Sequence, residues 1–269
     1  MRVRPAALSS SRAMATATYV YCVVQSGRKP STLRVPAGLP GGEKPRVDQV
    51  GSKMWVVHAP VPLERYGTQP LEESLRDLEW VSAIAVAHEA VVEHFAGLRG
   101  VTVIPMKLFT LFSSPDRAIG EMQRRSKRLT SVFAKLQGCE EWGVRIMRGP
   151  SRSAVKGDGK PASGTAFLTA RKRARDESVA ALRDSAQAAD DAYVLLAEIA
   201  ADHRRRQQEA SGVIPPLLDA AFLVPVRRRA RFRALAERAA EDVLQRGGRL
   251  TLTGPWPAYN FVSAAGQQA

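Results

Sequence analysis

The 269-residue chain has only two cysteines and no long apolar run. Cys22 and Cys139 are too few for a disulfide scaffold, and they are not grouped at the short spacing that a structural zinc cluster needs. Such sparing use of cysteine is typical of a reducing, cytoplasmic setting. A membrane-spanning helix needs roughly 18–20 consecutive apolar residues. The sequence therefore predicts no membrane span and no membrane partner.

Acidic residues are also scarce. The chain has 26 Asp and Glu against 40 Lys and Arg, which gives a formal net charge of +14. A surplus of this size indicates an acidic partner, which is a nucleic acid, an anionic membrane or an acidic protein. Net charge alone does not choose among the three.

Residues 1–17 contain three arginines and no acidic residue. They loosely resemble a transit peptide, but we favour the alternative that translation begins at Met14. We expect a disordered basic extension over 1–17 and a disordered end over 263–269.

The first part of the chain mixes strand and helix patterns. β-Branched and aromatic residues at 18–24 predict a strand, and the segment 47–60 predicts a hairpin that turns at Gly51-Ser52. Over residues 71–95 apolar side chains recur every three or four positions, which predicts one amphipathic helix.

Two more elements complete this half. The apolar segment 101–112, bounded by Gly100 and Ser113, predicts a buried strand that bends at Pro105, and a further apolar periodicity predicts a helix over 115–136. We assign residues 18–137 to an N-terminal α+β domain.

The second half reads as β-α-β-α-β. We predict a strand, a long helix, a strand, a helix and a strand at 140–147, 165–208, 217–226, 227–245 and 249–254. A small sheet with two long helices on one face has the arrangement of a ferredoxin-like fold, here with a modified connection. The predicted fold class is α+β with two domains, the second being a modified ferredoxin-like domain over 138–262 that ends in an aromatic tail.

No group of residues predicts an enzyme, a metal site or a cofactor site. His88 and His94 are six positions apart on one helix and so cannot share a metal ion. The stretch 155–163 lacks the spacing of a phosphate-binding loop. The carboxylate pairs at 140–141 and 190–191 point apart and read as solvated surface, and the cysteines as bystanders.

Arginine is concentrated in three clusters, at 171–175, 204–206 and 227–233. Each cluster is a solvated helix face, a nucleic-acid contact or a docking face for an acidic protein, although no nucleic-acid-binding motif accompanies them. Our candidate partner-binding residues lie at the end of the long predicted helix and the start of the next one: Arg204, Arg205, Arg206, Arg227, Arg228, Arg229 and Arg231.

Large aromatic side chains lie close to the end of the chain, in a segment restricted by Pro255 and Pro257. Trp256, Tyr259 and Phe261 can each bury on the order of 150–250 Å². We expect these five residues to anchor the tail against the protein. The alternative is an exposed aromatic hook for a partner.

Six segments in this order together resemble the gas vesicle protein GvpL/GvpF family. They are HEAVVEHF, VTVIPMKLFTLF, EWGVRIM, SGTAFLTARKR, LLDAAFLVP and LTGPWPAYNFV. The chain departs from the family pattern at Lys107-Leu108-Phe109-Thr110, where Arg-Phe-Gly-Thr is common. Ala258 replaces a usual proline and Asn260 a common serine.

The resemblance implies a two-domain α+β protein with a modified ferredoxin fold in its C-terminal domain. It also implies an accessory or minor structural component of gas vesicles, which binds the small hydrophobic shell protein GvpA and other accessory proteins during assembly. It implies no enzymatic activity and a location in the cytoplasm, at the gas vesicle. The alternatives are a basic nucleic-acid-binding protein, and an enzyme that would need a pocket with convergent polar groups.

Overall fold

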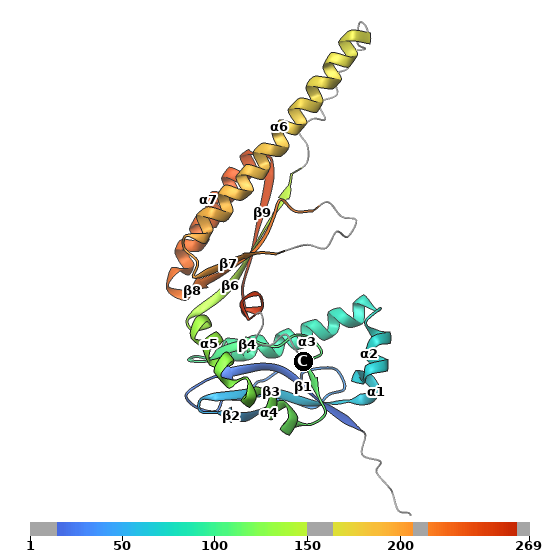
Figure 1. Ribbon diagram of the computed structural model, residues 1–269, viewed down its shortest axis with the longest axis vertical. Helices are drawn as coiled ribbons and strands as arrows, with labels where there is room; N and C mark the ends of the chain where they lie inside the picture. Colours follow the sequence, from blue (N-terminus) through green and yellow to red (C-terminus); the bar gives the residue numbers. More distant parts are fainter. Residues whose placement is uncertain (1–14, 150–163, 207–214, 263–269) are drawn as a thin grey trace, which may run out of the picture. The chain divides into compact units, whose positions relative to one another are not determined.

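A computed structural model describes residues 15–149, 164–206 and 215–262 (Figure 1). The chain divides between Lys135 and Leu136 into two compact units, each with its own sheet. No helix in these described ranges is long and apolar enough to cross a membrane.

The first unit is built on an antiparallel sheet of five strands. The strands run in the order β2-β3-β1-β4, and β5 also pairs with β1. Eight successive residues of β1 are buried, because the strand lies in the middle of the sheet. The strands are β1 (Thr16–Gln25), β2 (Arg46–Gly51), β3 (Met54–Pro62), β4 (Thr102–Pro105) and β5 (Leu111–Phe112).

The predicted helices of this unit are broken where a local cap competes with helix continuation. The helix predicted over 71–95 is two helices, because Asp77 accepts the backbone N–H groups of Glu79 and Trp80 and starts a new one. The helix predicted over 115–136 divides at Arg125. The helices are α1 (Leu63–Tyr66), α2 (Thr68–Ser74), α3 (Leu78–Ala96), α4 (Pro115–Arg124) and α5 (Ser126–Leu136).

The strand predicted over 101–112 is likewise two strands, β4 and β5, with a turn between them. Phe109 takes a left-handed backbone conformation in this turn, with φ of 62°. Its ring stacks in parallel on Trp80 of α3, with centroids 5.8 Å apart. Glycine adopts this conformation without strain, whereas a residue with a Cβ atom such as Phe109 does not.

The second unit has an antiparallel sheet of four strands in the order β7-β8-β6-β9. The helices α6 and α7 lie side by side on one face of the sheet (Figure 1) and share its core with the even-numbered residues of β6 and β8. The elements in chain order are β6 (Cys139–Arg148), α6 (Gly164–Ala197), β7 (Asp202–Arg205), β8 (Leu218–Pro225), η1 (Val226–Arg228), α7 (Arg229–Gln245), β9 (Gly248–Trp256) and η2 (Tyr259–Phe261).

The prediction of a helix from 165 to 208 is wrong at its C-terminal end. The helix α6 ends at Ala197, and Ala201 already donates its backbone N–H to the carbonyl of Leu223 in β8, at 2.7 Å. The chain then forms β7, an extra strand at the edge of the sheet, so the element order is β-α-β-β-α-β rather than β-α-β-α-β. Pairing with β8 overrides the helical pattern of an Arg-rich segment that has no strong preference of its own.

Some predictions concern residues outside the described ranges. These are most of the basic extension over 1–17, the end at 263–269 and the segment 155–163 that lacks a phosphate-binding motif. Residues 16 and 17 begin β1 and so are part of the sheet rather than of a disordered extension.

Candidate functional site: the polar face of the second sheet

Side chains of the second sheet alternate between two faces with different chemistry. The face under α6 and α7 is apolar. The opposite face, which we call the polar face, carries the odd-numbered residues of β6 and β8, those of β9 as far as Thr253, and the even-numbered residues of β7, because the registers bring these residues together. Its charged residues are Glu141, Arg145, Asp202, Arg204, Asp219 and Arg249.

Asp219 is the centre of an ion-pair cluster on the polar face. Its carboxylate accepts a hydrogen bond from Arg145 Nη2 at 2.7 Å on one oxygen and from Arg206 Nε at 2.7 Å on the other. The side chain of Asp219 is only 5% exposed, whereas those of Arg145 and Arg206 are 53% and 37% exposed. Two guanidinium groups therefore share one buried carboxylate, and the cluster keeps a net positive charge that faces solvent.

Gly143 makes room for this cluster. A Cβ atom at Gly143 would lie 2.7 Å from Thr253 Oγ1 and 3.3 Å from Arg206 Nη2. A side chain here would have to displace the Thr253 hydroxyl and crowd Arg206, so glycine at this position serves the packing of the polar face rather than the backbone conformation.

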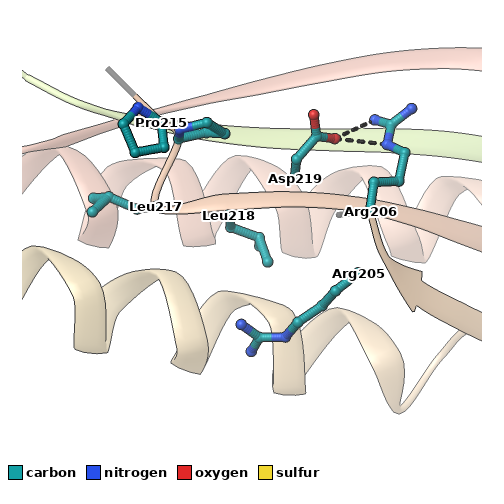
Figure 2. A pocket seen from close by; sticks show the side chains of 7 residues that line it. Arg205, Arg206, Pro215, Leu217, Leu218 and Asp219 are labelled. Atoms are coloured by element: carbon teal, nitrogen blue, oxygen red, sulfur yellow. Dashed lines mark hydrogen bonds and ion pairs between the residues drawn. The ribbon is translucent and has the colours of Figure 1, made fainter. Parts of the chain in front are cut away.

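A pocket of about 270 Å³ opens beside the cluster (Figure 2). Arg206 and Asp219 form one side, and Pro215 and Leu217 form part of the rest. Figure 2 shows Arg205 turned away from Asp219, toward the helices on the other face. The pocket offers a guanidinium group beside apolar walls, which suits a carboxylate-bearing side chain.

The chain end folds back onto the polar face at a second carboxylate. Glu141 is 3% exposed and accepts hydrogen bonds from the backbone N–H and the side-chain amide of Asn260, the backbone one at 2.9 Å. Burial raises the pKa of Glu141, while the bonds from Asn260 and the charges of Arg206 and Arg204 lower it in part. The guanidinium carbon of Arg204 lies over the ring of Phe261, 5.5 Å from its centroid.

The predicted tail residues divide into buried and exposed ones. Phe261 is 2% exposed and Pro257 is buried, whereas Trp256 is 44% exposed and Pro255 is exposed. Tyr259 is half-buried. The expectation that Trp256 is buried as an anchor is wrong, because the residue lies in the terminal position of the edge strand β9.

The structure separates the candidate arginines into three places. Arg204 and Arg206 reach the polar face, but Arg205 points to the other face, where it pairs with Asp190 at 2.7 Å and lies 4.3 Å from the ring centroid of Tyr193. The prediction that the three lie at the end of a helix is wrong, because α6 ends at Ala197 and the chain then forms β7. Alternation along β7 sends neighbouring side chains to opposite faces.

The second group of candidate arginines lies around the start of α7. Arg228 donates to the backbone carbonyl of Ile199 at 3.0 Å, and Arg229 forms a two-bond ion pair with Glu140. These contacts explain the positive charge at a helix N-terminus, where the helix dipole opposes it. Arg227 and Arg231 are exposed.

The sequence did not lead us to the acidic residues that pair with these arginines and hold the tail, which are Glu140, Glu141 and Asp219. Glu140 and Glu141 do point apart, as predicted, but neither is on solvated surface: one pairs with Arg229 and the other holds the tail. Asp219 lies in an otherwise apolar strand, and an isolated carboxylate inside an apolar run is the one sequence signal that could have identified it.

Other titratable residues are held in unreactive states. Burial raises the pKa of the Cys22 thiol and, less completely, that of Cys139, which disfavours the reactive thiolate. His88 is 2% exposed, its Nδ1 lies 2.8 Å from the Tyr19 hydroxyl, and burial lowers its pKa to about 4. Within the described ranges, no group of three or more His, Cys, Asp or Glu is arranged to hold a metal ion.

Comparison with known sequences finds one family across nearly the whole chain. The family model described as "Gas vesicle synthesis protein GvpL/GvpF" matches residues 17–263. The chain is 30% identical to "Gas vesicle protein L" of Streptomyces sp. (strain CB03234) over 259 residues, which cover 92% of this chain and 93% of that protein. It is 24% identical to "Gas vesicle protein L2" of Halobacterium salinarum (strain ATCC 700922 / JCM 11081 / NRC-1), with 96% and 95% of the two chains covered.

Solved structures with the same fold are also found. The gas vesicle protein GvpF from Anabaena sp. PCC7120 superposes with a TM-score of 0.64 at 16% identity, covering 92% of this chain and 96% of that one. GvpF from Microcystis aeruginosa gives a TM-score of 0.60 at 14% identity, covering 92% and 99%. At these identities the likeness shows the fold alone.

Proposed function

The chain belongs to the gas vesicle synthesis protein GvpL/GvpF family, and from this membership we propose that it acts in gas vesicle assembly as an accessory or minor structural protein. In this role it binds the small hydrophobic shell protein GvpA and other accessory proteins, in the cytoplasm and at the growing vesicle. The observation that carries the proposal is the family match over residues 17–263. We propose no enzymatic activity.

The charge of the second unit supports a docking role. Arg227 and Arg231 are exposed beside arginines that are already engaged within the chain, and the cluster around Asp219 keeps a surplus positive charge. We propose that these two places meet acidic groups of the partner. Charge of this kind mainly sets the rate and orientation of encounter, and so its effect decreases with added salt.

The tail supports the same role in two ways. The buried ring of Phe261 and the bonds between Asn260 and Glu141 hold the tail on the polar face. The half-exposed ring of Trp256 is then left as a contact for an apolar partner. We propose that Phe261 is the anchor and Trp256 the hook.

We also propose that the second unit is a ferredoxin-like module. The order β-α-β-β-α-β, with two helices on one face of a sheet ordered β7-β8-β6-β9, supports this assignment. The fold does not by itself give the function.

The test is a pull-down of purified shell protein with this chain at low and at moderate salt, with duplex DNA of arbitrary sequence as competitor. We expect capture that DNA does not displace and that weakens with salt. The variants Arg227→Glu and Arg231→Glu should reduce capture, whereas Arg28→Glu, an exposed charge reversal in the first unit, should not.

Two outcomes would contradict the proposal. No capture of the shell protein together with tight, strongly salt-dependent DNA binding would favour the alternative of a nucleic-acid-binding protein, which the net charge of +14 supports. Capture that Trp256→Ala leaves unchanged, at unchanged thermal stability, would remove the hook from the proposal.

A further inference from the structure

The second sheet has two edges of different character. The strand β7 forms one edge and is four residues long, with Asp202, Arg204 and Arg205 among them. The strand β9 forms the other edge and is nine residues long, with Arg249 as its single charged residue. Natural proteins protect edge strands by shortness or charge, because an open edge pairs with other chains. The first edge has both protections, whereas β9 is long and has one charged residue, and its one proline, Pro255, lies near its end.

The outer edge of β9 is free of any strand in the described ranges and presents the peptide groups of two leucines. Gly149 donates its backbone N–H to the carbonyl of Gly247 at 2.8 Å, and this marks residues 149 and 247 as a hydrogen-bonded pair. Bonded pairs alternate along an antiparallel ladder, so the peptide groups of Arg249 and Thr251 face β6. Those of Leu250 and Leu252 therefore point outward, toward the free edge.

The side chains of β9 differ on its two faces. Leu250 and Leu252 are half-buried against the core under the helices. Arg249 and Thr251 are exposed on the polar face, where the register places Thr251 opposite Arg145. A strand added at this edge would place alternate residues beside the two leucines and the others beside Arg249 and Thr251.

We propose that the outer edge of β9 is a docking site for an extended segment of an acidic partner protein, in which apolar and acidic side chains alternate. The segment adds to the sheet as a new edge strand: its backbone bonds to the peptide groups of Leu250 and Leu252, its apolar side chains extend the core, and its carboxylates pair with Arg249. Pairing with a second copy would instead bring the arginines of two polar faces together, where like charges repel. The proposal is independent of the gas vesicle assignment, since its test needs no gas vesicle protein.

The first experiment measures amide hydrogen exchange on the full chain, with and without a capped peptide of alternating valine and glutamate. We expect the amides of Leu250 and Leu252 to exchange more slowly when the peptide is present. The amide of Thr251 faces β6 and should be protected in both states. A matched peptide of alternating valine and lysine should protect neither leucine.

The second experiment measures peptide affinity by fluorescence anisotropy in variants. The charge reversal Arg249→Glu should weaken binding of the acidic peptide by about tenfold, whereas Arg233→Glu, an exposed reversal on α7, should leave it unchanged. Leu252→Pro removes an outward N–H and should abolish binding. Proline is tolerated at such positions of an edge strand, and a melting temperature will show whether the variant is folded.

Three results would overturn the proposal. They are equal protection by the acidic and basic peptides, acidic-peptide binding that leaves the amides of Leu250 and Leu252 unprotected, and protection of these amides that rises with protein concentration alone together with a dimer mass. The last result would identify a second copy as the occupant. The exchange experiment uses the unmodified chain, so it decides the question even if Leu252→Pro does not fold.

Discussion

Glu141 accepts a hydrogen bond of 2.9 Å from the backbone N–H of Asn260, which lies 119 residues further along the chain. This contact holds the C-terminal 3₁₀ turn η2 against the first strand of the second unit. The buried carboxylate of Glu141 is therefore the polar group that holds the chain end in place. The prolines and the tryptophan of the tail do not have this role.

Removal of this anchor should lower stability. Glu141→Ala leaves the backbone and side-chain N–H groups of Asn260 without their acceptor, and we expect a loss of about 1–3 kcal/mol of unfolding free energy. Urea denaturation at neutral pH measures the loss. The control is Glu241→Ala, an exposed carboxylate on α7, which should change the unfolding free energy by less than about 0.5 kcal/mol. Equal effects of the two variants would contradict the role of Glu141.

The same residue should make stability depend on pH. The pKa of Glu141 is raised in the folded state by burial, so between the ordinary pKa of a glutamate and this raised value the folded chain binds more protons than the unfolded chain. The contribution of Glu141 to the unfolding free energy therefore falls as the pH rises through that window. The loss is complete above the pKa that Glu141 has in the folded state. Comparison of the wild type with Glu141→Gln by urea denaturation between about pH 4 and pH 7 isolates the contribution. A contribution that rises with pH would show that the bonds from Asn260 outweigh burial.

Loss of the Asp219 carboxylate should destabilise the protein more than loss of an exposed carboxylate that pairs with an arginine. Asp219→Ala leaves Arg145 and Arg206 without the carboxylate they share, and we expect a loss of about 1–3 kcal/mol. The control is Asp190→Ala, whose carboxylate is 53% exposed and pairs with Arg205; its loss should be within about 0–1 kcal/mol, as for other surface pairs. Thermal melts of both variants measure the difference. An equal loss would mean that the polar-face cluster is only a surface ion pair.

Gly143→Ala tests the space that the cluster needs. The new methyl group would lie 2.7 Å from Thr253 Oγ1, so the Thr253 side chain or β9 must move, and we expect a loss of about 1–3 kcal/mol. The matched control is Gly120→Ala in α4, where nothing lies within 4 Å and a helical alanine should gain about 0.5–1 kcal/mol. Opposite signs in the two melting temperatures are expected. A Gly143→Ala variant as stable as the wild type would show that the polar face accommodates a methyl group at this position.

Phe109 tests backbone strain in the first unit. Phe109→Ala and Phe109→Gly both remove the stack on Trp80, but only glycine relieves the left-handed conformation at φ of 62°. We therefore expect the glycine variant to be more stable than the alanine variant by about 1 kcal/mol. Elsewhere glycine is normally the less stable of the two. Urea denaturation of the pair gives the difference directly, and a more stable alanine variant would show that the turn relaxes.

The sequence predicted most strands and the long helices because their patterns are local. Apolar periodicity placed α3, α7 and the strands β1, β6 and β8 close to their observed positions. The periodicity failed where a nonlocal contact or a competing local contact sets the structure. At β7, pairing with β8 replaces the end of a predicted helix. At Asp77, a side-chain cap divides a predicted helix into two.

The sequence by itself also determined the family, since six segments in order carry it. Only the tertiary structure decided which charged residues are used inside the protein. Arg206 and Asp219, Arg229 and Glu140, and Glu141 and Asn260 are joined by strand register and by the packing of α7, and no spacing in the sequence predicts such pairs. Alternation along a strand then sends Arg204 and Arg205 to opposite faces, so a cluster that is continuous in sequence is divided in space.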